Sequence, residues 1–463
     1  MAKKTTKKNV TKKAKKNSKP DTQAFSANLI IQKKRDGGSL TTEEVKWFID
    51  GYTAGTIPDY QMSALLMAIF IRGFNTTETA ALTDSMLYSG DVLDFKDITV
   101  IDKHSTGGIG DKTSFILAPI AAACGVKVPM IAGRGLGHTG GTVDKVESIK
   151  GFNTSLTMKQ FSEQLKKKGQ VMIGQTKEIA PADKKIYGLR DVTGTVESIP
   201  LITASIMSKK LAEGASGIVM DVKTGSGAFM QTLPDAKALA KSIRETALRF
   251  NKNIITMITN MDEPLGHYIG NSLEMIESIE TLRGKGPKDL TDLSVELAGA
   301  MIYLAKKAPT LKAGVKMAQE ALDSGVALDK FRELIALQGG DASYVDDYSK
   351  FPMAEYATDI IAPKNGYVKS IDGKALGLYV VDLGGGRKAS ADKIDFGVGF
   401  VTFKKVGDKV KKGEKIVTVY HHKHQAPIIK RIEKEMFERV FEIAAKPGKK
   451  IPLIIETTTS WSK

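Results

Sequence analysis

Two glycine-rich segments of the sequence place cationic and hydroxyl side chains where an anion could be held. The first spans residues 102–114 and combines Lys103, His104, Ser105 and Ser114 with glycines at positions 107, 108 and 110. Glycines allow a tight turn whose N–H groups, with the N-terminus of a following helix, form a cradle for phosphate. A purely structural turn is the alternative. The two cations and several hydroxyls in one loop favour an anion-binding site.

The second segment, residues 133–147, has five glycines in its first nine residues and follows another apolar run. We expect Thr142 to reach the same anion. His138 is interpreted as a structural hydrogen-bonding residue, and Arg134 as the structural partner of Asp144. A further glycine turn at residues 221–228 also follows a strand-like run. Ligands gather at the carboxyl ends of strands in open α/β sheets, so these turns should converge on one cleft.

Arg190 and the helix predicted over residues 199–213 form the next candidate group. Ser205 and Lys209 are four residues apart and therefore share one helix face. By itself such a pair is usually solvated, and Lys210 and Glu213 are expected on the solvated face. His421, His422 and His424 resemble a metal cluster but lack carboxylates at a useful spacing, so we interpret them as exposed turn residues.

The elements that must position these residues change in type along the chain. Residues 25–90 show helical periodicity, with a capped helix start at residues 41–44. Short apolar runs then alternate with helical stretches, which indicates an α/β unit with a mainly parallel sheet. The predicted strands are Ile98–Ile101, Val126–Ile131, Val171–Ile173, Gly217–Val222 and Asn253–Ile258. After about residue 350, glycines and alternating apolar positions predict short antiparallel strands with tight turns, as around residues 406–415.

The predicted fold class is thus α/β with a separate all-helical lobe and a C-terminal β-rich, barrel-sandwich-like domain. The predicted boundaries are a Lys-rich disordered tail over 1–22, a helical lobe over 23–94 to which 181–214 return, an α/β phosphate-binding domain over 95–180 and 215–348, and a C-terminal α+β domain over 349–463.

Composition narrows the class of protein. The chain has 463 residues, of which 42% are hydrophobic and 26% charged, as in ordinary globular proteins. Its apolar runs are far shorter than the about 20 residues of a membrane span. The single cysteine, Cys124, excludes an internal disulfide and a cysteine-based zinc site. These features predict a cytoplasmic protein without a membrane partner.

The net charge of +16 is concentrated at one end of the sequence. Residues 1–20 contain nine lysines and no acid, and only 11 of the 68 basic residues are arginine. A nucleic-acid-binding module would need basic residues clustered on the folded body. We therefore expect a solvated tail and no nucleic-acid partner. Binding that survives deletion of residues 1–20 would favour the nucleic-acid hypothesis.

The stretch from Asp102 to Met230 resembles the thymidine and pyrimidine-nucleoside phosphorylase family. The most specific match is Gly133-Arg134-Gly135-Leu136 followed by Thr139-Gly140-Gly141-Thr142, Asp144 and Glu147. The resemblance extends from about residue 25 to 445. It implies an enzyme that cleaves pyrimidine nucleosides with phosphate, built as a homodimer through the helical lobe with its active site between the lobes.

The resemblance also implies roles for individual residues. Lys103, Ser105, Ser114 and Thr142 would surround inorganic phosphate, the co-substrate. Arg190, Ser205 and Lys209 would hold the pyrimidine, and His104 would face it from the other side. No cofactor is required for this chemistry, although some members use potassium. Its site would be formed by the positions matching Gly110, Lys112, Leu265, Tyr268 and Glu277.

Three positions bear on how this chain differs from its relatives. Ala132 stands where the family usually has serine, so one phosphate hydroxyl is missing, worth about 1 kcal/mol. Lys112 stands where a small hydroxyl residue is expected and could place its own ammonium in the cation site. Met130 matches a position that is lysine in broad-specificity members and methionine in those that prefer thymidine.

An anthranilate-type phosphoribosyltransferase is the alternative enzyme, because it resembles this fold and also has a Thr-Gly-Gly loop. Such enzymes need magnesium and a paired acidic motif. The matching region here offers Asp221 followed by Val222 and Lys223, without an adjacent acid.

Overall fold

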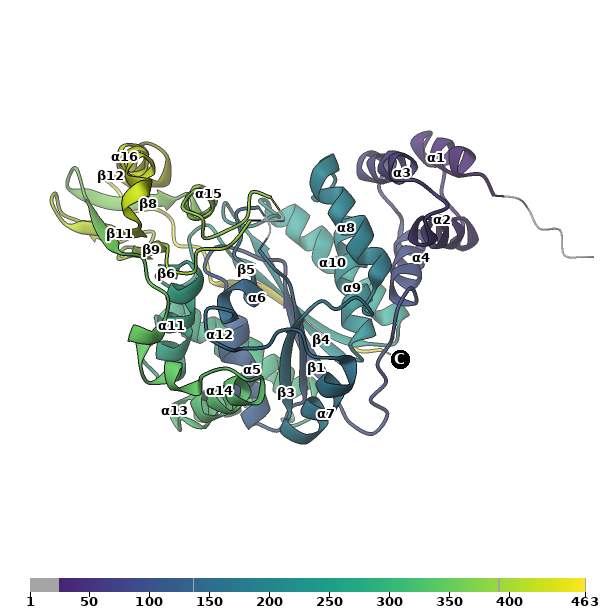
Figure 1. Ribbon diagram of the computed structural model, residues 1–463, viewed down its shortest axis with the longest axis horizontal. Helices are drawn as coiled ribbons and strands as arrows, with labels where there is room; N and C mark the ends of the chain where they lie inside the picture. Colours follow the sequence, from purple (N-terminus) through teal and green to yellow (C-terminus); the bar gives the residue numbers. More distant parts are fainter. Residues whose placement is uncertain (1–24, 136, 390–391, 463) are drawn as a thin grey trace, which may run out of the picture.

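The computed structural model describes residues 25–135, 137–389 and 392–462. A helical lobe, a central α/β unit and a C-terminal β-rich unit lie in a row, with the α/β unit in the middle (Figure 1). This arrangement agrees with the predicted fold class. The predicted N-terminal tail lies outside the described residues. No helix in the described part of the chain is long and apolar enough to cross a membrane.

The helical lobe has a core of its own. It consists of α1 (Ala27–Arg35), α2 (Thr42–Ala54), α3 (Asp59–Arg72) and α4 (Thr76–Leu87), joined by α8 (Pro181–Thr193) and α9 (Ile199–Ala212). The predicted helix start is confirmed by a capping box in which Thr41 accepts from the backbone N–H of Glu44, whose side chain accepts from that of Thr41. Ala182 and Ile186 of α8 are buried in this core.

Helix α9 joins the two lobes. Its first half contributes Leu201 and Ala204 to the core of the helical lobe. Its second half contributes Met207 and Leu211 to the core on one face of the α/β sheet. The helix therefore lies between both lobes, and its side chains have fixed positions relative to each.

The α/β unit is built on parallel strands. β1 (Ile101–Ser105), β4 (Gly217–Thr224) and β5 (Asn253–Asn260) pair in parallel, and β2 (Val128–Ala132) pairs in parallel with β3 (Gln170–Gly174). An isolated parallel bridge between Val100 and Lys127 connects the two groups. The helices of this unit are α5 (Thr113–Ala123), α6 (Thr142–Val146), α7 (Met158–Lys168), α10 (Leu233–Arg249), α11 (Asn271–Leu282), α12 (Lys288–Leu304), α13 (Leu311–Asp323) and α14 (Val326–Leu337).

One predicted strand is displaced. The expected strand over Ile98–Ile101 begins only at Ile101 and continues through Lys103 and His104 to Ser105. A run of apolar, β-branched residues marks a strand only where apolar groups cover both of its faces. At its carboxyl end β1 reaches the ligand cleft, so polar side chains replace apolar ones without ending the pairing with β4.

The C-terminal unit contains two antiparallel sheets. Their strands are ordered β6-β9-β11-β7 and β10-β8-β12. The bounds are β6 (Tyr268–Ile269), β7 (Tyr356–Ile361), β8 (Gly366–Ile371), β9 (Gly399–Thr402), β10 (Lys409–Val410), β11 (Lys415–His421) and β12 (Phe441–Ala444). The helical segments of this unit are α15 (Gly373–Asp382), α16 (Ala426–Glu435), a π-helix over Met436–Val440 and a short 3-10 turn, Lys423–Gln425. Two further 3-10 turns, Ala342–Val345 and Tyr348–Lys350, precede the unit and pack on the core of the α/β unit.

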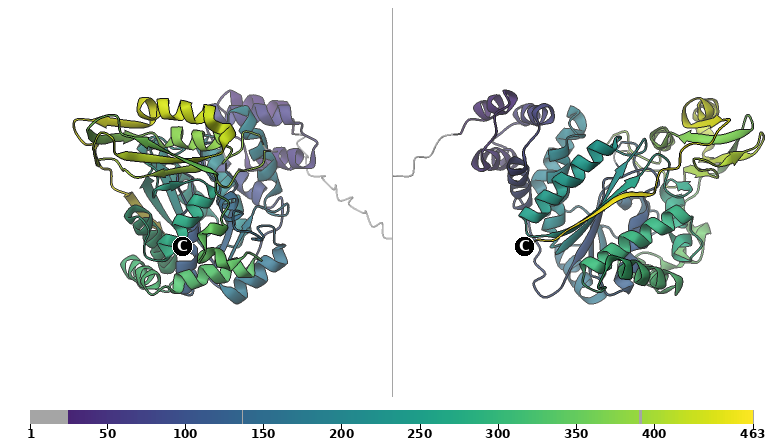
Figure 2. Two further views of the ribbon diagram at one scale, coloured as in Figure 1. Left: turned by 60° about the vertical axis from the view of Figure 1, so that its left-hand side comes forward. Right: turned by 180° about the vertical axis from the view of Figure 1, so that it is seen from behind.

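Two expectations for this region are wrong. The last strand, β13 (Ile454–Ser460), does not belong to the C-terminal unit: it pairs antiparallel with β5 at the edge of the α/β sheet (Figure 2). Sequence order alone gives no sign of this return. His421 is buried at the end of β11, where its Nε2 lies 2.8 Å from Thr358 Oγ1. Only His424 of the three histidines is exposed, and His422 is paired with Asp395.

Candidate active site

A cleft of about 830 Å³ lies between the helical lobe and the carboxyl ends of the parallel strands. Nine of the residues predicted for phosphate, pyrimidine and sugar line this single cleft: Lys103, His104, Ser105, Ser114, Met130, Thr142, Arg190, Ser205 and Lys209. They come from β1, β2, α5, α6, α8 and α9. The structure therefore brings together side chains that are separated by more than 100 positions in the sequence.

The floor of the cleft is a turn that follows β1. Gly107 and Gly110 have φ angles of 84° and 74°, which side chains with a Cβ rarely adopt. Ser105 Oγ accepts from the N–H of Gly107 at 3.1 Å, and α5 begins at Thr113 directly behind the turn. Ser114 thus lies in the first turn of a helix, where the exposed N–H groups favour an anion.

Lys103 is the cation of this floor, and it is almost fully buried. Its Nζ donates to Thr113 Oγ1 at 2.7 Å and lies 3.9 Å from carboxylate oxygens of Asp111 and Asp221. Burial lowers the pKa of Lys103 despite these two carboxylates. Burial opposes ionisation of Asp111, but Lys103 and Lys223 outweigh it and hold the pKa of Asp111 low. An anion entering here would add to a network of alternating charges.

The opposite wall is made by α8 and α9. Lys209 Nζ donates to Asp183 Oδ2 at 2.5 Å and to Ser205 Oγ at 2.9 Å. Burial lowers the pKa of Lys209 in spite of the Asp183 carboxylate. The predicted Ser205–Lys209 pair is therefore not a solvated surface pair. It is held in the cleft by a buried acid.

Arg190 is fixed at the end of α8. Its guanidinium donates to the carbonyls of Thr195, Leu201 and Val196, at 3.2, 3.2 and 2.6 Å. These three bonds fix the plane of the guanidinium at the cleft wall. The planar guanidinium suits recognition of a carbonyl oxygen better than a flexible ammonium does.

His104 is enclosed by cations. Burial, then the ammonium groups of Lys210, Lys209 and Lys103, lower the pKa of His104 well below its usual value, and Asp111 opposes them only weakly. The imidazole is therefore neutral at pH 7. A neutral imidazole still donates one hydrogen bond and accepts another.

Two cleft residues were missed by the sequence analysis. Tyr187 lines the cleft with its ring centroid 5.5 Å from Arg190 Cζ and 6.0 Å from Lys209 Nζ, and burial raises its pKa to about 12. Asp183 anchors Lys209. Asp183, Tyr187 and Arg190 follow one another at spacings of four and three residues, so they share one face of α8. That spacing was the available signal.

The prediction that Lys210 and Glu213 are solvated is wrong, because both side chains are fully buried. Lys210 Nζ donates to Asp102 Oδ2 at 2.5 Å, to the carbonyl of Ile131 at 3.1 Å and to Glu213 Oε2 at 3.1 Å. Burial and the neighbouring Asp102 raise the pKa of Glu213 well above its usual value. This cluster joins α9 to β1 and β2 beneath the cleft.

The second glycine-rich segment has the predicted structural pair. Arg134 Nη1 lies 2.9 Å from Asp144 Oδ1 and 2.7 Å from Glu147 Oε2. Asp144 also accepts from Arg387, which comes from the C-terminal unit, at 3.0 Å. His138 is mostly buried, with its ring 5.4 Å from that of Phe229. It is absent from the cleft lining, which agrees with a structural role.

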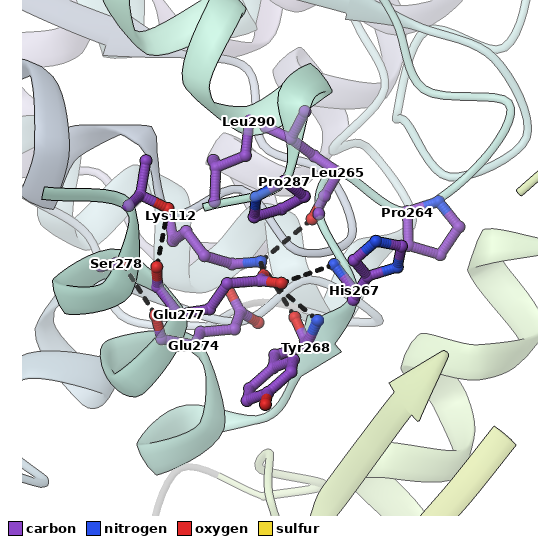
Figure 3. Close-up of polar contacts among 12 residues, drawn as sticks. Lys112, Pro264, Leu265, His267, Tyr268, Glu274, Glu277, Ser278, Pro287 and Leu290 are labelled. Atoms are coloured by element: carbon purple, nitrogen blue, oxygen red, sulfur yellow. Dashed lines mark hydrogen bonds and ion pairs between the residues drawn. The ribbon is translucent and has the colours of Figure 1, made fainter. Parts of the chain in front are cut away.

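The predicted potassium position lies behind the floor of the cleft, and Lys112 reaches into it (Figure 3). Lys112 is fully buried, and its Nζ donates to the carbonyls of Leu265 and Tyr268 at 3.0 and 2.9 Å and to Glu277 Oε2 at 2.5 Å. These oxygens belong to three of the predicted cation ligands. With the ammonium at their centre, the residues present do not fit a potassium ion.

Three family models match the chain. They are the glycosyl transferase family helical bundle domain over residues 28–90, the glycosyl transferase family a/b domain over residues 97–328 and the pyrimidine nucleoside phosphorylase C-terminal domain over residues 367–437. Together they cover all three units of the fold in their chain order.

Curated relatives and a solved structure give a consistent result. The pyrimidine-nucleoside phosphorylase of Geobacillus stearothermophilus is 49% identical over 429 residues, which covers 92% of this chain and 98% of that protein. A protein of the same name from Staphylococcus epidermidis is 52% identical over 393 residues, covering 84% and 91%. The crystal structure of anthranilate phosphoribosyltransferase from Thermus thermophilus matches with a TM-score of 0.56 at 20% identity, covering 67% of this chain and 99% of that one. This last likeness is one of fold alone.

Proposed function

The chain belongs to the pyrimidine-nucleoside phosphorylase family, and from this premise we propose the following reaction and residue roles. The enzyme transfers the pentose of a pyrimidine nucleoside to inorganic phosphate, giving the free base and (2-deoxy)ribose 1-phosphate. The observation that carries the residue roles is that two cationic groups face one cleft from opposite lobes. One group suits phosphate and the other suits a pyrimidine.

The phosphate side would bind and orient the nucleophile. Lys103, Ser105, Ser114 and Thr142 offer an ammonium and three hydroxyls, and α5 adds the N–H groups of its first turn. A phosphate oxygen then forms a bond to the anomeric carbon while the bond from that carbon to pyrimidine N1 breaks. The electron pair of the broken bond stays on the base. Holding both reactants in line replaces an encounter in solution by a unimolecular step.

The pyrimidine side would stabilise the leaving group. As the bond to N1 breaks, negative charge spreads onto the carbonyl oxygens of the base. Arg190 and Lys209 line the cleft and would interact more strongly with that charge than with the neutral nucleoside, which lowers the barrier. Ser205 would add a hydrogen bond. Neutral His104 would donate a hydrogen bond to the base from the opposite wall.

A phosphate-dependent assay of base release tests this function. Thymine and uracil release would be measured from thymidine, deoxyuridine and uridine, with phosphate present, omitted or replaced by sulfate. We expect release only with phosphate, together with one equivalent of pentose 1-phosphate. Release without phosphate would indicate a hydrolase, and no release from any of these nucleosides would contradict the proposal.

The site does not favour the phosphoribosyltransferase alternative. Such an enzyme needs exposed carboxylates for magnesium and diphosphate. Asp221 is fully buried, and its two carboxylate oxygens accept from Lys223 Nζ at 2.7 Å and Thr259 Oγ1 at 2.6 Å. Its side chain is therefore bonded within the protein interior and is not available to a magnesium ion.

We also propose a homodimer formed through the helical lobe and a cytoplasmic location. Large apolar side chains are exposed on α1 and α3, which pack against each other: Leu29, Tyr60, Met67, Phe70 and Ile71. An apolar face of this kind supports association with a second copy. Phosphate and the nucleoside are the small-molecule partners, and no further cofactor is needed for the steps described above.

A further inference from the structure

The site around Lys112 is built like a cation site, but a side chain fills it. An ammonium group has three N–H donors, and Lys112 directs them to two backbone carbonyls and one carboxylate (Figure 3). All of its contacts are oxygens, at 2.5 to 3.0 Å. Oxygen ligands of this kind suit hard cations, and rings of carbonyls replace the hydration shell of potassium in other proteins.

The oxygen cage is held in place by bonds that do not involve Lys112. Glu277 accepts from the backbone N–H groups of His267 at 2.8 Å and Tyr268 at 3.1 Å, which fixes both the carboxylate and the turn that supplies the carbonyls. A Cβ at Gly266, whose φ is 70°, would lie 2.4 Å from Glu277 Oε2. The turn therefore approaches the carboxylate as closely as its backbone allows.

Charge and size favour a monovalent cation in this cage. One carboxylate, Glu277, is balanced by one positive charge, whereas a divalent ion would leave an excess. The contacts of 2.9 and 3.0 Å to the carbonyls are longer than the about 2.0–2.1 Å that magnesium requires. Without Lys112, the buried Glu277 would be left without its partner, which is strongly unfavourable.

The cage connects parts of the protein that meet at the phosphate floor. Lys112 precedes α5 and lies two residues before Ser114, while Tyr268 belongs to β6, which pairs with β9 of the C-terminal unit. A cation here ties the phosphate turn to α11 and to the third unit. Losing the cation should loosen the turn that would hold phosphate.

We propose that Lys112 is a covalently attached replacement for a monovalent metal ion, and that shortening this side chain opens a functional potassium site. The proposal rests on the proposed function only for its activity readout. The protein as it exists is then insensitive to the monovalent cation in the buffer, and Lys112→Thr becomes dependent on potassium.

The experiment compares three variants with the unchanged protein: Lys112→Thr, Lys112→Met and Lys34→Met. The methionine at 112 removes the charge, and its side chain, one atom shorter than that of lysine, places an apolar methyl group at the mouth of the cage and blocks an ion. Lys34→Met removes a different buried ion pair, with Glu78 at 2.9 Å in the helical lobe, and is the matched control. Each protein is placed in potassium, sodium or choline chloride at equal ionic strength. Thermal unfolding without substrate and phosphate-dependent base release are both measured.

We expect the unfolding midpoint of the unchanged protein to be the same in the three salts and its rate to differ by less than about twofold. Lys112→Thr should lose about tenfold or more in activity in choline, and potassium should restore activity and the unfolding midpoint together in a saturable way. Lys112→Met and Lys34→Met should show no potassium-specific recovery.

Several results would overturn the proposal. These are a potassium requirement in the unchanged protein, a folded Lys112→Thr that ignores potassium, or potassium recovery that Lys112→Met or Lys34→Met shares. A Lys112→Thr protein that stays unfolded in every salt would also overturn it, because the cage would then not accept an ion. If the unchanged protein releases no base, the proposed function fails, and the unfolding measurements still decide the cation question.

Discussion

At the scale of single residues, Lys209 is predicted to be essential for turnover. Lys209→Met should lower kcat by several powers of ten, because the ammonium is the cation on α9 that lines the cleft beside Ser205. The substitution also leaves the buried Asp183 without its partner, which costs about 3–5 kcal/mol of stability. Steady-state kinetics and urea unfolding measure the two effects.

The double variant Lys209→Met with Asp183→Asn separates these effects. Asparagine is neutral, so the double variant should recover most of the lost stability while remaining inactive. Near-normal turnover in either folded variant would show that α9 does not form part of the pyrimidine site.

Met130 is predicted to set the preference for the sugar. It is buried and lines the cleft from β2. Methionine offers a ribose 2′-hydroxyl only a weak acceptor, and an unpaired buried polar group costs about 1–3 kcal/mol. Deoxyuridine should therefore exceed uridine by about one to two powers of ten in kcat/KM. The two substrates would be compared directly, and Met130→Lys should narrow the gap. Equal kcat/KM values in the unchanged protein would show that Met130 has no such role.

At the scale of elements, α9 holds two sets of residues with different tasks. Ser205 and Lys209 face the cleft, while Lys210 lies beneath it with Asp102 and Glu213. Asp102 Oδ1 and Glu213 Oε1 have no hydrogen-bond partner among the described residues, and a proton shared between them would satisfy both. Burial and the neighbouring Asp102 raise the pKa of Glu213, which favours the protonated form of its carboxyl group. The cluster thus fixes α9 against β1, the strand that carries Lys103 and His104.

Lys210→Met is predicted to lower kcat by about a hundredfold, the cost of displacing catalytic groups by about 1 Å. Glu213→Gln should retain most of the turnover because it preserves a neutral hydrogen-bonding group, whereas Glu213→Leu should not. The Lys34→Met protein controls for the loss of a buried ion pair. If Glu213→Leu displaces α9 and leaves β1 in place, KM for phosphate should change little. A Leu variant as active as the Gln variant would contradict a positioning role.

The same helix shows why part of the fold was predictable and part was not. Parallel strands β2 to β5 follow from their apolar, β-branched runs, because they are buried on both faces. Charged side chains are mostly exposed, so the sequence predicts Lys210 and Glu213 on the solvated face of this helix. Yet α9 has buried residues on all sides. A helix that is apolar all round is buried, so its charges must be internal.

The part of the candidate site that lies in sequence motifs was predictable, and the rest was not. Lys103 to Ser114 and Thr142 stand in glycine-rich turns after strands, and their position relative to the sheet follows from topology. Tyr187 and Asp183 stand in an ordinary amphipathic helix, and only the tertiary packing of α8 brings them to Lys209. Sequence reasoning therefore finds residues that interact through backbone turns more readily than residues that meet through the packing of two helices.

At the scale of the whole molecule, acid is predicted to destabilise the fold through its histidines. Burial lowers the pKa of His104, His138 and His267. Below about pH 6.5 the unfolded chain takes up protons that these buried and half-buried groups do not, so the unfolding free energy falls as pH decreases through that value. Urea unfolding at pH values of about 7.5, 6.5 and 5.5, which bracket the ordinary histidine pKa, measures the slope. His138→Gln should flatten the slope of unfolding free energy against pH. His424→Gln, at an exposed position, should not. An unchanged slope in His138→Gln would exclude that residue as a source.

The proposed dimer gives a second prediction at this scale. Introducing charge on the apolar face by Ile71→Glu, a position that is 67% exposed, should convert the dimer to monomers. Ile361→Glu, which is 55% exposed on the C-terminal unit, is the matched control and should remain dimeric. Light scattering after size-exclusion chromatography gives the mass. A monomeric unchanged protein, or a dimeric Ile71→Glu protein, would contradict an interface on this face.

The return of β13 to the α/β sheet has a mechanical consequence. Because β13 pairs with β5, the chain that leaves the C-terminal unit is anchored on the α/β sheet, and β6 and β7 connect the two units at further places. A body attached at several separate points cannot swing freely in any direction. Its loop bearing Arg387 consequently stays within reach of Asp144. The C-terminal unit should therefore move together with the α/β unit whenever the cleft changes its width.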